Sequence, residues 1–283
     1  MNFTEEPLFI PCTGEQMVGI LALPEVPADV GVVLVVGGPQ TRVGSHRQFV
    51  LLARTLVLAG YAVLRFDYRG MGDSTGSQRA FDAVNNDVAA AIDSLQAATS
   101  SVRRIVLWGL CDAASAALLY WHGTRDQRIA GFCLVNPWVR SPATLARTQV
   151  RHYYGRRMIS AEFWRKVVRG QVGVGRAVGG LLRSFRLSGQ SPAAGGSVLS
   201  FRERMLETLK DCVAPVLLIL SRRDFVAKEF LETARSDPEW SAILTRPSLV
   251  RQDFSDADHT FSSAELRAQL EQATLNWLDR TFG

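Results

Sequence analysis

The chain is poor in the features that mark exported, membrane-spanning and metal-binding proteins. Its opening residues, MNFTEEPLFIPCTGEQ, have neither a basic start nor an apolar run, so we expect no secretory signal. No stretch approaches the roughly 20 apolar residues that a membrane span requires. The four cysteines are far apart and lack C-x-x-C spacing. Three of them (Cys12, Cys133 and Cys212) lie in or beside apolar runs, as small buried residues do. We therefore expect reduced cysteines and a cytoplasmic location.

Apolar runs and helical patterns alternate along most of the 283 residues, of which 47% are hydrophobic. An N-terminal hairpin comes first, and a helix is expected from about His46 to Ala59, with Ser45 as its N-cap. The strand-like runs are VGVVLVV (30–36), YAVLRF (61–66), RIVLW (104–108), GFCLVNP (131–137), APVLLIL (214–220) and SLVRQDF (248–254). This alternation predicts an α/β fold, with a mostly parallel central sheet and helices on both faces.

Residues 139–212 interrupt this alternation and carry most of the basic charge. They hold 14 Lys and Arg against four Asp and Glu, a net charge of +10, whereas the remainder carries a net charge of −5. A connection of this length predicts an inserted helical cap between core segments 1–138 and 213–283. Its arginines favour an anionic substrate, such as a sugar phosphate, a CoA thioester or an acidic polysaccharide, or form a solvated helical face. A nucleic-acid partner is disfavoured, because no binding module is recognisable.

The stretch VLWGLCDAASAALLYW, residues 106–121, predicts a strand, an abrupt turn and a helix, with Cys111 at the turn. Many hydrolases place a serine at such a point, in the pattern G-x-S-x-G. The pattern needs small residues two positions before and after the nucleophile, and Gly109 and Ala113 meet this need. A sulfur at a helix N-terminus is favoured as thiolate. Cys111 is therefore a candidate nucleophile, and the alternative is a buried structural cysteine.

A thiol nucleophile needs a base, and the sequence holds only four histidines. His122 would lie about 16 Å along the same helix and cannot reach Cys111. His152 falls in the insertion, and His46 is either a residue of the cleft or a surface residue at a helix start. His259, in DFSDADHTF, follows the last strand and precedes the final helix. It is the predicted base.

The base must be oriented by a carboxylate at a neighbouring strand end. Asp224 follows the run APVLLIL and completes the chain order nucleophile, acid, base. The competing position after the preceding strand holds Asn136, so Asp224 is the preferred acid. Asp256 and Asp258 flank the histidine, where a solvated loop is the simpler interpretation.

An oxyanion hole would complete such a site. One donor is the backbone N–H of Asp112, directly after the nucleophile, and the other is expected from VVGGPQ. Gly38 can supply its N–H there, whereas Pro39 has none. Arg42, His46 and Arg47 follow this loop and are candidates for substrate contact.

These motifs resemble those of the α/β-hydrolase superfamily over nearly the full length of the chain. GGPQ is similar to the HGGPG motif of proline iminopeptidase-like members, with Val36 in place of their histidine, and DYRGMGDS is similar to the D-x-R-G-x-G-x-S loop. GGPQTRVGSHRQFV, LRFDYRGMGDS, LWGLCDAASAALLY and NPWVR together resemble the exosortase A system-associated hydrolases, type 1. Those proteins belong to bacterial gene neighbourhoods for exopolysaccharide production and PEP-CTERM protein sorting. A cysteine at the turn also resembles dienelactone hydrolase and polyhydroxyalkanoate synthase, but Ala113 replaces their last glycine.

The resemblance implies an α/β-hydrolase fold, and the residues point to acyl transfer. We expect hydrolysis of an ester or thioester through a Cys111–His259–Asp224 triad and an acyl-thioenzyme, with no metal or organic cofactor. An acyltransferase would use the same triad and pass the acyl group to a sugar hydroxyl. A non-catalytic partner of the export machinery is the third interpretation.

Overall fold

Eight strands form one twisted sheet in the structure, a computed structural model that describes residues 2–38, 40–140 and 199–283. The strand order is β1-β2-β4-β3-β5-β6-β7-β8. The first two strands form an antiparallel hairpin, β2 pairs antiparallel with β4, and the six strands from β3 to β8 are parallel. The strands are β1 (Phe3–Cys12), β2 (Glu15–Pro24), β3 (Val30–Val35), β4 (Ala62–Phe66), β5 (Arg104–Leu110), β6 (Ile129–Val135), β7 (Val216–Ser221) and β8 (Leu249–Phe254).

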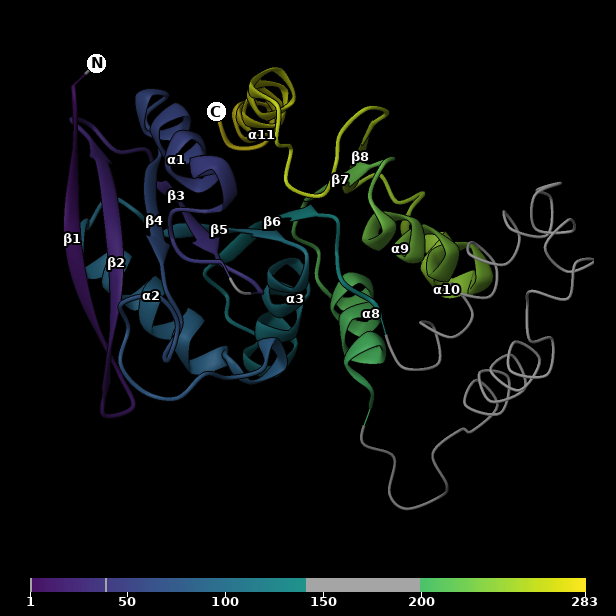
Figure 1. The fold of residues 1–283 in the computed structure, drawn as a ribbon, viewed down its shortest axis with the longest axis horizontal. Coiled ribbons are helices and arrows are strands. Elements are labelled where there is room, and N and C mark those ends of the chain that lie inside the picture. The colour runs from purple at the N-terminus through teal and green to yellow at the C-terminus, as the bar shows by residue number, and fades with distance from the viewer. Residues whose placement is uncertain (1, 39, 141–198) are drawn as a thin grey trace, which may run out of the picture. The chain divides into compact units, whose positions relative to one another are not determined.

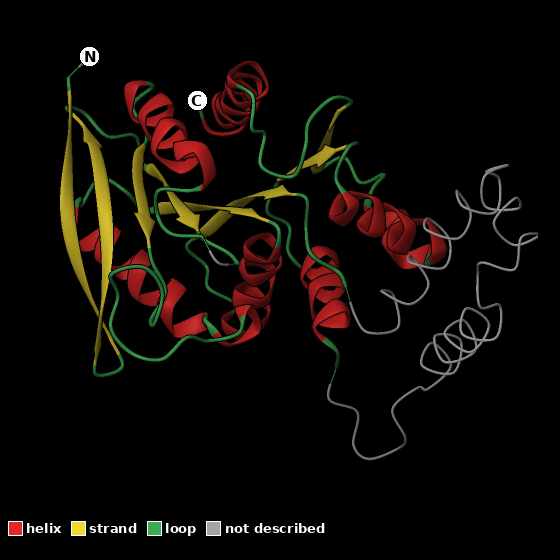
Figure 2. Cartoon of the chain, viewed as in Figure 1, coloured by secondary structure: helices red, strands yellow, loops and turns green. Residues whose placement is uncertain are grey.

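Helices cover both faces of this sheet (Figures 1 and 2). Helices α1 and α11 lie on one face, and α2, α3 and α8 lie on the other (Figure 1). The helices are η1 (Ser45–Arg47), α1 (Gln48–Leu58), η2 (Phe81–Ala83), α2 (Asn85–Ala98), α3 (Asp112–Thr124), α8 (Phe201–Asp211), α9 (Phe225–Ser236), α10 (Pro238–Ile243) and α11 (Ala264–Phe282), where η marks a 3-10 helix. The predicted α/β fold with a mostly parallel sheet is therefore confirmed.

The core follows from apolar residues on both faces of the central strands. All six residues of β3 are buried, and alternate ones serve opposite sides of the sheet. Val32 and Leu34 pack in a cluster with Trp108 of β5, Phe49 of α1 and Trp277 of α11. A strand covered on both faces has no polar side, which is why VGVVLVV reads as a continuous apolar run.

The first helix begins later than the sequence predicts. His46 and Arg47 have φ angles of 54° and 61°, in the left-handed region, so the regular helix starts at Gln48 rather than His46. The N-cap position of α1 is held by Arg47, which makes no side-chain capping hydrogen bond, and Ser45 belongs to the short helix η1. The backbone departs from a helix here in a way that residue propensity does not reveal, because left-handed φ angles are uncommon outside glycine.

Most of the predicted cap, residues 139–212, lies outside the described residues. One compact unit comprises Met1–Trp138 and Leu199–Gly283, so the chain returns to the core at Leu199. Helix α8 falls in the predicted cap, yet it packs on α3, where the Thr208 hydroxyl donates to the Leu118 carbonyl at 2.9 Å. The inserted cap itself stays a prediction for residues 141–198.

Among the described residues, no helix combines the length and apolar character needed to cross a membrane. All four cysteines are described, and all four are free thiols. Three are buried, whereas Cys111 is partly exposed.

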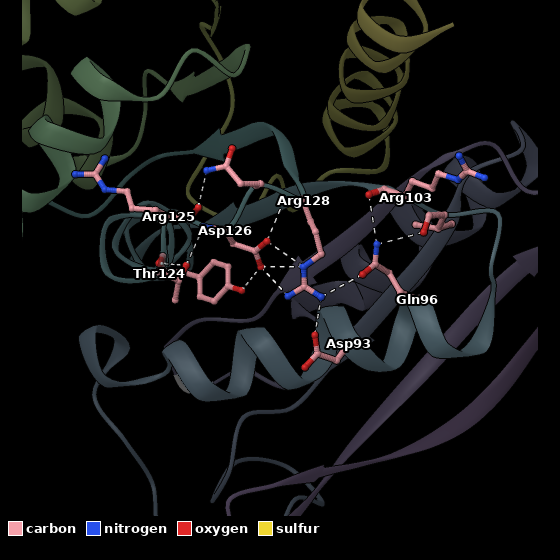
Figure 3. Close-up of polar contacts among 10 residues, drawn as sticks. Asp93, Gln96, Arg103, Thr124, Arg125, Asp126 and Arg128 are labelled. Atoms are coloured by element: carbon pink, nitrogen blue, oxygen red, sulfur yellow. Dashed lines mark hydrogen bonds and ion pairs between the residues drawn. The ribbon is translucent and has the colours of Figure 1, made fainter.

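A polar network joins α2 to the start of β6, at the amino ends of the parallel strands (Figure 3). Arg128 donates to Asp126 at 2.7 Å and to Asp93 of α2 at 2.6 Å. The Tyr120 hydroxyl donates to the same Asp126 carboxylate at 2.6 Å. Burial alone would raise the pKa of Asp126, but the hydrogen bonds from Arg128 and Tyr120 lower it from 3.8 to about 2.

This network predicts an acid-sensitive contribution to stability. Because the pKa of Asp126 is lowered in the folded state, its stabilisation is complete above pH 3.8 and disappears as the pH falls toward 2. Arg128 is one-third exposed, so we discount the pKa shift and expect about 1–2 kcal/mol. The free energy of unfolding, measured in guanidinium, should be higher for the wild type than for Arg128→Met. This difference should be about 1–2 kcal/mol larger at pH 5 than at pH 2. A difference that is constant with pH would contradict the assignment.

Candidate active site

A strained turn between β5 and α3 carries Cys111. Its backbone has φ 63° and ψ −124°, a conformation that is unusual for a residue with a side chain. The turn brings β5 against α3 so closely that a Cβ atom on Gly109 would lie 2.6 Å from the Ala113 carbonyl group. The Cys111 amide donates to the Val135 carbonyl of β6 at 2.8 Å. The turn predicted from the spacing of Gly109, Cys111 and Ala113 is present, and the sulfur stands at a helix N-terminus.

His259 and Asp224 meet at the same edge of the sheet. Asp224 ends the turn after β7, and His259 lies in the loop between β8 and α11. The Asp224 Oδ2 atom accepts a hydrogen bond from His259 Nδ1 at 2.8 Å. The other carboxylate oxygen, Oδ1, accepts from the Val226 amide at 3.0 Å and caps helix α9. Asp224 is thus fixed from two sides, and it holds the imidazole with its other nitrogen free to face a thiol.

The surroundings of His259 favour its protonated form. The hydrogen bond to Asp224, followed by the interaction with the Cys111 side chain, raises the pKa of His259 from 6.5 to about 10, while burial acts against this shift. The carboxylate and the thiol thus both act on this imidazole. An imidazolium between carboxylate and thiolate is an arrangement that can pass a proton to a leaving group.

Asn136 holds the loop of His259 in place. It is fully buried after β6, with a left-handed φ of 47°. Its side-chain oxygen accepts from the Ser221 amide at 2.8 Å, and its side-chain nitrogen donates to the Ser221 hydroxyl at 3.0 Å and to the His259 carbonyl at 3.4 Å. In the sequence, the position of Asn136 was considered only as an alternative to Asp224 for the carboxylate that orients the base. A buried amide at a strand end was the signal for this positioning role.

The two aspartates beside His259 stabilise the loop. Asp258 accepts from the Thr260 and Ser262 amides at 3.2 and 3.0 Å, which turns the chain toward α11. Asp256 pairs with Arg223 at 2.7 Å on the surface. Neither carboxylate competes with Asp224 for His259.

One of the two amides expected to form an oxyanion hole, that of Gly38, already donates to a side chain. The Gly38 amide, at a φ of 59°, donates to Oδ2 of Asp112 at 2.9 Å. Asp112 is the first residue of α3, so its carboxylate lies near the helix N-terminus. Gly38 and Asp112 therefore lie together, and the Asp112 carboxylate takes up the Gly38 amide.

The three candidate substrate contacts lie apart from this arrangement. Arg42 forms an ion pair with the fully buried Asp67 and another, at 2.5 Å, with Asp73. Its guanidinium therefore fixes the DYRGMGDS loop. His46 and Arg47 form the turn before α1. None of the three is among the described residues that line the cavity at Cys111.

A cavity of about 500 Å³ opens over Cys111 and His259. Its described walls combine aromatic and aliphatic side chains with a few polar groups, and none of the described lining residues is Lys or Arg. They are Gly37, Gly38, Gln40, Ser45, Phe49, Phe81, Leu110, Cys111, Asp112, Trp138 and His259. Mostly apolar walls with few converging polar groups are typical of small-molecule sites.

Within residues 2–38, 40–140 and 199–283, no group of three or more His, Cys, Asp or Glu side chains is arranged to hold a metal ion.

Comparisons with known proteins agree with the fold. No curated protein matches the sequence. An esterase from Pyrococcus furiosus is similar in structure, with 18% identity, a TM-score of 0.65 and coverage of 99% of this chain and 92% of that one. A thermophilic esterase from Thermogutta terrifontis has 20% identity, a TM-score of 0.59 and coverage of 98% and 100%. A Butyrivibrio proteoclasticus protein with bound ferulic acid has 16% identity, a TM-score of 0.63 and coverage of 97% and 98%. At these identities, the similarity shows a shared fold.

Family membership rests on the sequence itself. Residues 32–271 match the sequence model of the alpha/beta hydrolase family, a range that includes Cys111, Asp224 and His259. The fold, the turn at Cys111 and this match agree, and the chain belongs to the alpha/beta hydrolase family.

Proposed function

We propose that the protein hydrolyses a carboxylic ester or thioester through an acyl-thioenzyme on Cys111. The observation that carries the proposal is His259, held by Asp224 at 2.8 Å and acting together with the Cys111 side chain at one cavity. Nucleophilic acyl transfer requires a nucleophile, a base and a carboxylate that orients the base.

The reaction begins with the thiolate of Cys111 and the imidazolium of His259. The sulfur attacks the carbonyl carbon, an S–C bond forms, and the carbonyl electron pair moves onto oxygen. Collapse of this tetrahedral intermediate expels the alcohol or thiol, which takes its proton from His259. Water then attacks the acyl-thioenzyme while His259 accepts a proton, and the acid leaves as Cys111 is restored. The amides of Gly38 and Asp112 are the donors for the oxyanion.

The described cavity walls support a neutral, apolar acyl group. Phe49, Phe81, Leu110 and Trp138 supply the apolar lining. Arg42, a candidate substrate contact from the sequence, is paired with Asp67 and Asp73. The esterase neighbours from Pyrococcus furiosus and Thermogutta terrifontis support the choice of an ester.

The biological setting that we propose is bacterial exopolysaccharide production or PEP-CTERM sorting. Its support is the resemblance of the GGPQTRVGSHRQFV and LWGLCDAASAALLY segments to the exosortase A system-associated hydrolases. Acylated oligosaccharides therefore belong in the substrate panel beside simple esters and acyl-CoA thioesters.

Trapping the acyl-enzyme tests the proposed function. The protein is mixed with p-nitrophenyl butyrate, quenched in acid within the first turnover and analysed by intact mass and peptide mapping. We expect one butyryl group on Cys111, and Cys212→Ala, which removes a buried thiol, should give the same result. Addition of a sugar alcohol separates the two enzymatic hypotheses, because a transferase would form the sugar ester in preference to butyrate. No acyl group on Cys111 with any panel substrate would contradict the proposal.

A further inference from the structure

The carboxylate of Asp112 accepts a hydrogen bond that the proposed mechanism assigns to a developing oxyanion. The Gly38 amide, one of the two expected donors, already donates to Asp112 Oδ2 at 2.9 Å. The second expected donor is the amide of Asp112 itself, at the start of α3. Burial raises the pKa of the Asp112 carboxyl, whereas the backbone amides of Gly38, Ala113 and Asp112 oppose this by favouring its charged form. One of the two expected donors, the Gly38 amide, is thus engaged by this carboxylate.

The space for this carboxylate is created by the absence of a side chain at Gly37. A Cβ atom there would collide with Asp112 Oδ1 and would lie 2.7 Å from the Ala113 nitrogen. Asp112 Oδ1 is buried and has no hydrogen-bond partner among the described residues. The carboxylate is therefore held through the hydrogen bond from the Gly38 amide to Oδ2, while no hydrogen bond from the described residues stabilises Oδ1.

We propose that Asp112 blocks the oxyanion hole of the resting enzyme, so that the substrate carbonyl must displace its carboxylate from the Gly38 amide before Cys111 can attack. This inference rests on the proposed function of Cys111. The carboxylate and the oxyanion compete for the same N–H donor, and a negative charge left beside the reacting carbonyl would oppose a second one. Asp112 thus sets a threshold that a substrate must overcome through its other contacts in the cavity.

Reversible aldehyde binding tests the inference without a leaving group or a hydrolytic step. Addition of the Cys111 thiolate to butyraldehyde forms an S–C bond and places the carbonyl electron pair on oxygen, which requires the oxyanion hole. Alkylation of Cys111 by iodoacetamide displaces iodide and needs no such hole. The first reaction reports on Asp112 and the nucleophile together, and the second reports on the nucleophile alone.

Three variants are compared with the wild type. Asp112→Ala removes the carboxylate, and Asp112→Asn keeps its size but removes its charge. Asp29→Ala is the matched control, because it also removes a carboxylate. Asp29 lies directly before β3, pairs with Arg104 of β5 and does not line the cavity. Since one oxyanion donor is worth roughly 10²- to 10³-fold in rate, we expect butyraldehyde to bind Asp112→Ala about tenfold more tightly or better. Asp112→Asn should show a smaller gain and Asp29→Ala no change, and the alkylation rate of Cys111 measured on each variant corrects for any change in the thiolate itself.

The outcomes separate the inference from the proposed function. Unchanged or weaker aldehyde binding in both Asp112 variants, with normal alkylation of Cys111, would overturn the blocking role and leave the nucleophile intact. If iodoacetamide does not alkylate Cys111 selectively in the wild type, the assignment of Cys111 as the nucleophile is wrong, and the inference fails with it. Because Asp112→Asn is isosteric, it keeps the test decisive if Asp112→Ala fails to fold.

Discussion

Replacement of Cys111 by alanine is expected to lower the turnover of a small activated ester by about 10³-fold or more, with no loss of fold. The sulfur is the atom that forms the acyl bond in the proposed mechanism, and it faces a cavity, so its removal leaves no void in the core. The measurement is kcat/KM for p-nitrophenyl butyrate, with the unfolding free energy measured beside it. Cys212→Ala is the matched control, since it removes a buried thiol remote from the cavity lining.

Cys111→Ser sharpens this prediction. It restores the oxygen nucleophile common at such turns, but an alkoxide is harder to form than a thiolate. We expect a slow esterase that reacts with fluorophosphonate probes, whereas the wild type is inactivated by iodoacetamide. Full turnover in Cys111→Ala, or alkylation of Cys111 without inhibition, would show that the thiol is not the nucleophile.

Asp224→Asn is expected to lower kcat/KM by about 10²- to 10⁴-fold while preserving helix α9. An asparagine oxygen can still accept from the Val226 amide, because Asn and Asp cap helices about equally well. Its NH₂ group would then face His259 Nδ1 and donate to it. The imidazole proton would move to the nitrogen that faces Cys111, where it prevents His259 from accepting a proton.

The pH dependence of this variant identifies the electrostatic part of the effect. Loss of the carboxylate should bring the pKa of His259 from about 10 down toward 6.5, measurable by NMR titration of the ring. A raised folded-state pKa stabilises the wild type fully below pH 6.5, and this contribution is lost as the pH rises through about 10. The stability difference between wild type and variant should therefore shrink from pH 6 to pH 10. An unchanged His259 titration would contradict the pairing with Asp224.

The fold was predictable because its signals are local and repeated. VGVVLVV and APVLLIL are continuous apolar runs because their strands are covered on both sides, and helical patterns separate them. The site was predictable in outline for a related reason. Parallel strands place their carboxyl ends at one edge, so residues directly after them meet there. Asp224 and His259 follow this rule, and Gly109 reveals the tight turn at Cys111 by its lack of a side chain.

What could not be predicted depends on side-chain partners that are distant in sequence. Asp112 was chosen for its backbone amide, and the sequence does not indicate that its carboxylate turns toward Gly38, 74 positions away. Arg42 was a candidate substrate contact, but its nearest carboxylates come from the loop after β4. Asn136 has its role because β6, β7 and the loop of His259 converge on it. Such choices are fixed by packing and hydrogen-bond geometry rather than by local propensity.

The uneven exposure of the four thiols has a practical consequence for enzyme preparations. Cys12, Cys133 and Cys212 are buried, and burial raises the pKa of all three thiols, which lowers their reactivity at neutral pH. Cys111 is the partly exposed thiol, and it lines the cavity. A single equivalent of a thiol reagent therefore titrates the proposed nucleophile of the folded protein, and uptake beyond one equivalent reports unfolded protein in the sample.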